Sequence, residues 1–131
     1  QQRSQTVLSD TLNYGNTSNQ IKIHNGNFLH NIGARGQDMH MAFLDGGFFG
    51  YLTNPFFDSA RIQNRIIATR DFVLNESSVN EDNAHGMACL SIVAGNIPGS
   101  YIGTAPSASF AKSLDVPVAW SPLDKPTPRS S

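Results

Sequence analysis

The sequence contains few of the features that would indicate a membrane, a nucleic acid or a disulfide-bonded fold. Its 131 residues include a single cysteine, Cys89, so no disulfide can form within the chain and cysteine usage indicates no redox compartment. Nine Lys and Arg residues balance ten Asp and Glu residues without any basic run, which argues against nucleic acid and anionic membrane surfaces. The longest apolar stretches, 41–44 and 89–93, are far shorter than the roughly 20 residues of a membrane-spanning helix. We therefore expect a soluble protein with neither a nucleic-acid nor a membrane partner.

The remaining composition is that of one loop-rich globular domain. With 39% hydrophobic residues, 15% charged residues, 11 Gly and 7 Pro, the chain is too apolar for a disordered protein and too varied for a coiled coil or collagen. Its length suits a single domain. Because the chain begins Gln1-Gln2-Arg3 without an initiator Met, we expect a processed product or a piece of a longer chain.

The composition changes twice along the chain and divides it into three parts. Residues 1–19 are polar and rich in Asn, Ser and Thr, which predicts an N-terminal arm with one helical turn over 7–12. Residues 20–111 contain the apolar patterns of a folded domain. Residues 112–131 hold four of the seven prolines and a Ser-rich end, which predicts an extended or disordered tail.

Within residues 20–111 the apolar spacing predicts alternating strands and helices. We expect a short helix over 28–32, strands over 39–44 and 65–74, a buried helix over 85–96 stopped by Gly95, and a third strand that runs from 101 past Pro106 to 111. This order predicts an α/β fold with an open, mostly parallel sheet and flanking helices. Sites in such sheets form at the carboxyl ends of strands, where Asp45 lies.

Asp45 and His85 together are a candidate for acid–base chemistry. Asp45 ends the first predicted strand, and His85 begins the buried helix 40 positions later. Alone, the first would be interpreted as a turn former and the second as a surface or capping residue. Together they have a chemical rationale, because the positive end of a helix dipole keeps a first-turn histidine neutral. A neighbouring carboxylate would fix the tautomer through Nδ1 and leave Nε2 free as a general base.

The motifs around these two residues resemble the subtilisin-like serine peptidases. Residues 41–48, Met-Ala-Phe-Leu-Asp-Gly-Gly-Phe, resemble the aspartate motif of that family, and residues 85–90, His-Gly-Met-Ala-Cys-Leu, resemble its histidine motif. Residues 103–110, Gly-Thr-Ala-Pro-Ser-Ala-Ser-Phe, are similar to the strand that follows the histidine helix. The three motifs stand in the family's order. The resemblance therefore implies the N-terminal part of a subtilisin-like α/β domain, truncated after its third strand.

By this resemblance the complete enzyme is a serine-type endopeptidase that acts on peptides or proteins. Asp45 would orient the ring of His85, His85 would act as the general base, and a serine would form an acyl-enzyme intermediate. Gly46 and Gly86 would support them, although Gly46 stands where the family usually has threonine. Cys89 matches a cysteine of the proteinase K-like branch, and its apolar surroundings favour a buried core residue over a thiolate nucleophile. The resemblance also implies secretion or a periplasmic location.

The serine motif of the family, of the Gly-Thr-Ser-Met-Ala type, is not among the 131 residues. Candidates for a nucleophile lie near the third predicted strand, at Ser100, Ser107 and Ser109, although an ordinary surface hydroxyl is the preferred interpretation of each. A truncated sheet would expose its last strand, so we expect self-association or pairing with a missing C-terminal portion. Two other functions stay open: a small serine hydrolase or esterase that uses a different serine, and a catalytically inactive binding fragment.

No cofactor or catalytic metal is predicted, because the remaining histidines at 24, 30 and 40 lack the spacing of a metal site. The family often binds structural calcium, for which the oxygen donors would be Asp71, Glu76, Glu81 and Asp82. An acidic, solvated loop is the preferred interpretation of that stretch. The aromatic-rich segment 48–57 would either line a substrate cleft or cover the sheet.

Overall fold

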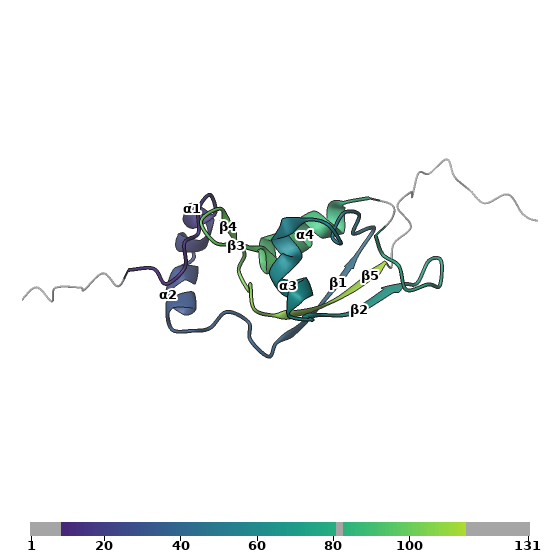
Figure 1. Ribbon diagram of the computed structural model, residues 1–131, viewed down its shortest axis with the longest axis horizontal. Helices are drawn as coiled ribbons and strands as arrows, with labels where there is room; N and C mark the ends of the chain where they lie inside the picture. Colours follow the sequence, from purple (N-terminus) through teal and green to yellow (C-terminus); the bar gives the residue numbers. More distant parts are fainter. Residues whose placement is uncertain (1–8, 81–82, 115–131) are drawn as a thin grey trace, which may run out of the picture.

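A three-stranded parallel sheet forms the centre of the computed structural model, which describes residues 9–80 and 83–114 (Figure 1). The strands β1 (His40–Asp45), β2 (Ile66–Asp71) and β5 (Ser109–Leu114) lie in the order β1-β5-β2. Both neighbouring pairs are parallel, so Asp45 and Asp71 end at the same edge of the sheet, each opposite Leu114. The predicted α/β class with an open, mostly parallel sheet is confirmed.

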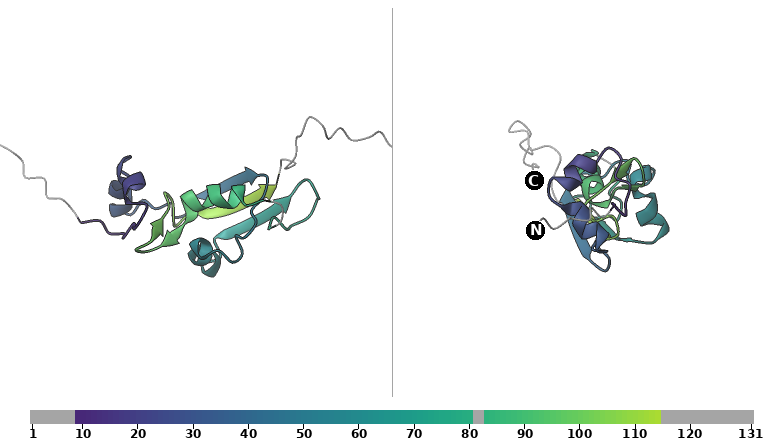
Figure 2. Two further views of the ribbon diagram at one scale, coloured as in Figure 1. Left: turned by 90° about the horizontal axis from the view of Figure 1, so that it is seen from above. Right: turned by 90° about the vertical axis from the view of Figure 1, so that its left-hand side faces the viewer.

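Helices cover one side of this sheet. The longest, α4 (His85–Ala94), packs against β1, and the one-turn helix η1 (Pro55–Phe57) leads directly into α3 (Asp58–Ile62). Figures 1 and 2 show α3 and α4 on the same side, with α1 (Ser18–Lys22) and α2 (Gly26–Asn31) beyond the end of the sheet. The main core lies between the sheet and these helices. Its largest fully buried side chains include Phe48, Phe57, Phe110 and Leu90.

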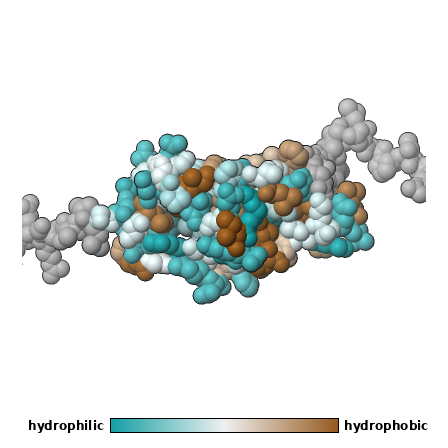
Figure 3. All heavy atoms as spheres, viewed as in Figure 1, coloured by the Kyte–Doolittle hydropathy of each residue, from teal (hydrophilic) through white to brown (hydrophobic). Residues whose placement is uncertain are grey.

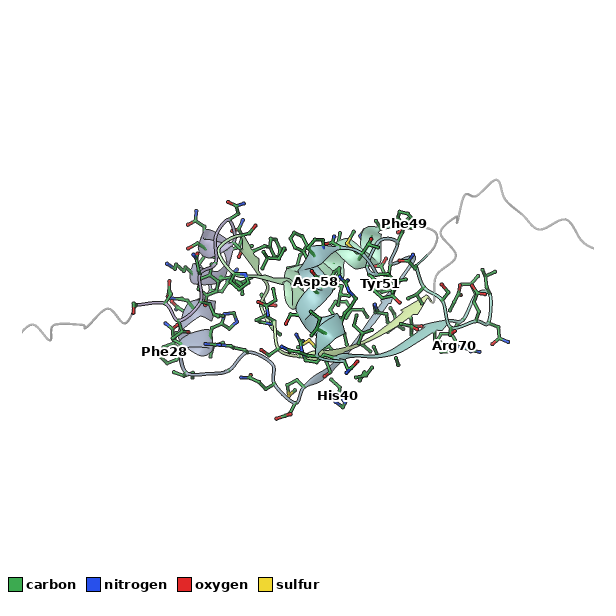
Figure 4. All side chains as sticks on the ribbon, in the orientation of Figure 1. Phe28, His40, Phe49, Tyr51, Asp58 and Arg70 are labelled. Atoms are coloured by element: carbon green, nitrogen blue, oxygen red, sulfur yellow. The ribbon has the colours of Figure 1, made fainter. Side chains whose placement is uncertain are left out.

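The other side of the sheet has no helix over it among the described residues. Along β1, Met41 and Phe43 pack against the core, whereas His40, Ala42 and Leu44 are exposed. Figure 4 shows the side chain of His40 pointing away from the helices. Parallel sheets are usually covered on both faces, so this open face is unusual for the class.

A second, smaller core joins the N-terminal helices to a β-hairpin formed by β3 (Asn96–Ile97) and β4 (Tyr101–Ile102). Thr17 binds Ile102 twice, since its Oγ1 donates to the Ile102 carbonyl at 2.9 Å and accepts from the Ile102 N–H at 3.1 Å. His30, 2% exposed, connects the same regions. Its Nε2 donates to the Thr104 carbonyl at 2.9 Å, so its Nδ1 accepts from the Tyr14 hydroxyl at 2.9 Å.

The prediction of a single strand over 101–111 is wrong. Residues 101–102 form β4 of the antiparallel hairpin, whereas the strand of the parallel sheet, β5, begins only at Ser109. Pro106 lies between them and lacks the N–H that a continuous ladder would need. The predicted helix over 85–96 is found at His85–Ala94, and Gly95 follows its last residue as predicted.

The predicted boundaries at both ends also shift. The helix α1 begins at Ser18, inside the segment predicted as an arm, and Tyr14 and Thr17 before it are buried. At the other end, β5 extends through Lys112 to Leu114, beyond the domain end predicted at 111. The predicted helical turn over 7–12 is wrong for residues 9–12, which form no helix. Residues 7 and 8 and the tail from 115 onward lie outside the described residues.

The aromatic segment after β1 mainly covers the sheet, which is the second of the two interpretations above. Phe48, Tyr51 and Phe57 are buried in the main core, and Phe49 is exposed at the surface. In Figure 4 Tyr51 lies among the core side chains and Phe49 at the rim. The face in Figure 3 has apolar patches interspersed among polar ones. None of the described helices has both the length and the apolar character needed to cross a bilayer.

Candidate acid–base site

The fold brings Asp45 and His85 together at the carboxyl end of β1. Asp45 is the last residue of this strand and His85 is the first residue of α4. Gly86 makes the approach possible because it has no side chain. Its N–H donates to the Gly47 carbonyl at 2.8 Å. A Cβ atom on Gly86 would lie 2.6 Å from that oxygen and 2.7 Å from the Cβ of Asp45. The helix can therefore start this close to the strand only with glycine at position 86.

The carboxylate of Asp45 contacts the Nδ1 atom of the His85 ring. His85 Nδ1 lies 2.9 Å from Oδ1 and 2.8 Å from Oδ2 of Asp45. Oδ1 also accepts the N–H of Gly46 at 2.7 Å, which restrains the carboxylate. Because a carboxylate only accepts hydrogen bonds, the ring proton is assigned to Nδ1, and Nε2 of the neutral ring keeps its lone pair. The side chain of Asp45 is 18% exposed and that of His85 is 72% exposed, so Nε2 is open to reactants.

Asn83 positions the start of α4, a role that the sequence analysis missed. Its side-chain Oδ1 accepts the N–H of His85 at 2.9 Å, and its carbonyl accepts the N–H of Phe49 at 3.0 Å. An Asn just before a predicted helix is a common N-terminal capping signal and could have indicated this contact. The two bonds fix the loop that leads into His85 against the segment that follows β1.

Cys89 lies on the same face of α4 as His85 and is half-buried, so the prediction of a buried core residue is wrong. Its Sγ is 3.9 Å from both ring nitrogens of His85. The physical reason is the spacing: residues four apart share a helix face, and the face of α4 that holds His85 is turned away from the core. The core face is formed instead by Gly86, Leu90 and Ala94.

The structure does not bring the candidate serines to His85. Ser109 is paired with His40 at the start of β1, five residues before Asp45, a separation of about 16 Å along a strand. The N–H of Ser107 donates to the Arg35 carbonyl just before β5, and Ser100 lies in the β3–β4 turn beyond the far end of α4. Within residues 9–80 and 83–114, no hydroxyl is within hydrogen-bond distance of His85 Nε2.

The residues expected to donate oxygen ligands to calcium do not form an open oxygen cluster among the described residues. Asp71 is fully buried, and its Oδ1 accepts the N–H groups of Val73 at 2.7 Å and Leu74 at 2.9 Å, as in a turn. Glu81 and Asp82 lie outside the described residues. The metal-ligand types that do converge are different ones, at Asp45, His85 and Cys89, whose ligand atoms lie within 4.8 Å of one another.

Comparisons with models of protein families, with curated proteins and with solved structures gave no match.

Proposed function

We propose that this chain provides the orienting acid and the general base of a serine-type peptidase. The observation that supports this role is the contact of the Asp45 carboxylate with His85 Nδ1 at 2.8 and 2.9 Å, with Nε2 left open to solvent. The resemblance of the motifs around both residues to those of subtilisin-like peptidases supports peptides as the substrate class.

In this mechanism His85 Nε2 removes the proton from a serine hydroxyl as its oxygen attacks the scissile carbonyl carbon. Asp45 stabilises the resulting imidazolium through the proton on Nδ1. The imidazolium then protonates the leaving amine, which leaves an acyl-enzyme. A water molecule, deprotonated by His85 in the same way, attacks the acyl carbonyl carbon and releases the acid. The hydroxyl and the oxyanion donors come from outside the described residues.

An activated ester tests the acid–base pair without a serine. A neutral, exposed imidazole hydrolyses p-nitrophenyl acetate by itself, so the purified chain needs no other group for this reaction. The exposed His24 and His40 also contribute a background rate, so we expect His85→Ala to remove the rate in excess of that background. Asp45→Asn should lower the His85-dependent rate at least about tenfold, because the Nδ1 tautomer is no longer fixed.

His24→Ala is the matched control, since His24 is also exposed but has no carboxylate partner in the described structure. Circular dichroism of each variant verifies that it is folded. A rate that is the same in wild type, His85→Ala and Asp45→Asn would show that the pair has no base function.

A further inference from the structure

Asp45, His85 and Cys89 bring three types of metal ligand to one place. A carboxylate oxygen, an imidazole nitrogen and a thiol sulfur all lie within 4.8 Å of one another. His85 and Cys89 are one turn apart on α4, and Asp45 reaches them from the end of β1. The set thus comes from a helix and a strand, and the Gly86–Gly47 hydrogen bond joins the start of α4 to the segment just after β1.

The distances are close to those of a tetrahedral zinc site. With Zn–N and Zn–O bonds of about 2.0 Å and a Zn–S bond of about 2.3 Å, tetrahedral ligand atoms lie about 3.3–3.6 Å apart. Here the nearest Asp45 oxygen is 2.8 Å from His85 Nδ1, and Cys89 Sγ is 3.9 Å from it. These two separations differ from the tetrahedral values by about half an ångström. The third pair, the Asp45 oxygen and Cys89 Sγ, lies within 4.8 Å, so binding requires the Cys89 and His85 side chains to rotate toward a shared metal ion.

The chemistry of the set selects the cation. Calcium and magnesium prefer oxygen ligands alone, whereas a thiolate combined with an imidazole suits zinc. The 72% exposure of His85 leaves room for water as a fourth ligand. Three protein ligands and one open position are typical of accessible zinc sites.

We propose that Asp45, His85 and Cys89 form a zinc site that switches off the base. Zinc takes the lone pair of His85 Nδ1, so the ring proton moves from Nδ1 to Nε2, while the Cys89 thiol releases its proton to solvent and its sulfur binds the metal. The neutral ring keeps one proton, now on the atom that acts as the base. The zinc site stands on its own geometry, and only the inhibition depends on the proposed function.

Binding is tested on the whole chain with Zn²⁺ and with Co²⁺ as a spectroscopic substitute. We expect one Zn²⁺ per chain by titration calorimetry and a thiolate-to-cobalt charge-transfer band. Cys89→Ser should abolish this band and weaken zinc binding at least about tenfold, and the control His24→Ala should change neither.

Alkylation of the wild-type chain gives a readout that needs no variant. Because Cys89 is the one cysteine of the sequence, iodoacetamide modifies a single thiolate with loss of iodide. Saturating Zn²⁺ should slow this reaction at least tenfold. Unchanged alkylation, absence of the cobalt–thiolate band, or equal affinity in Cys89→Ser would each overturn the zinc site.

The ester assay separates this inference from the proposed function. Zinc should lower the His85-dependent ester rate of the wild-type chain, and the ratio of rates with and without zinc should approach one in Cys89→Ser. Zinc binding at Cys89 that leaves the wild-type rate unchanged would overturn the switch. An ester rate independent of His85 would reject the proposed function, while the cobalt band and the alkylation rate would still decide whether zinc binds.

Discussion

Lys112 is a buried lysine whose replacement should stabilise the protein. It lies on β5 on the core side of the sheet and is 2% exposed. Its Nζ is 2.9 Å from the centroid of the Tyr51 ring and has no hydrogen-bond partner among the described residues. Burial, together with a smaller effect of the Arg61 charge, lowers the pKa of Lys112 from 10.5 to about 7.

Lys112→Met removes the amine and keeps an unbranched side chain of similar length. Below pH 7 the lysine is charged in both states, and the lowered pKa corresponds to a cost of about 5 kcal/mol in the folded state. The cation–π contact with Tyr51 offsets about 2 kcal/mol of this. We therefore expect Lys112→Met to raise the free energy of unfolding by about 2–4 kcal/mol at pH 6.

The pH dependence has a defined sign. Between pH 7 and 10.5 the unfolded chain holds the Lys112 proton while the folded chain has lost it, so wild-type stability rises with pH over this range. The advantage of Lys112→Met should therefore shrink as the pH increases. The comparison with wild type cancels groups that titrate in both proteins, such as Tyr14, whose pKa is raised by burial.

Urea unfolding at pH 6 and pH 9.5 measures this difference. Lys22→Met is the control, because Lys22 is 47% exposed and forms a surface ion pair with Asp10 at 2.7 Å. Its effect should stay within about 1 kcal/mol at both pH values. A Lys112→Met protein that is less stable at pH 6, or whose advantage is equal at both pH values, would refute the reasoning.

Two further predictions concern the site. Gly86→Ala should destabilise the protein by about 1–3 kcal/mol and slow the His85-dependent ester reaction, because its Cβ would lie 2.6 Å from the Gly47 carbonyl. The control is Ala88→Gly, on the exposed side of α4. It should destabilise the protein by about 1 kcal/mol without slowing the ester reaction. A serine-directed phosphonate should leave Ser100, Ser107 and Ser109 unlabelled by mass spectrometry, and a stoichiometric adduct on one of them that disappears in His85→Ala would contradict the strand register.

The elements that the sequence predicts well are those with local signals. The apolar run before Asp45 and the glycine at position 95 mark the ends of β1 and α4 to within a residue or two. The strand over 101–111 failed because an apolar pattern does not say which neighbour a strand pairs with. Pro98-Gly99 is a turn signal, and it could have indicated the hairpin that captures Tyr101 and Ile102.

The missed features of the site depend on tertiary packing. The helix α4 is apolar on nearly all sides, so its sequence does not show which face meets the sheet. Cys89 is therefore only half-buried and Ile92 is exposed, where a core was expected. Lys112 is buried because the parallel register places it between its neighbours Phe43 and Thr69. Neither fact follows from a local pattern.

The exposure of His85 predicts different outcomes for peptides and for activated esters. Peptide hydrolysis needs a positioned hydroxyl and oxyanion donors in a site that excludes water, and these contribute most of the barrier reduction. The described residues place only the Asp45–His85 pair, with a ring that is 72% exposed. An activated ester requires neither a second nucleophile nor an oxyanion site. The chain should therefore hydrolyse the ester through His85 while leaving peptides intact, and peptide hydrolysis should begin only when a serine reaches Nε2.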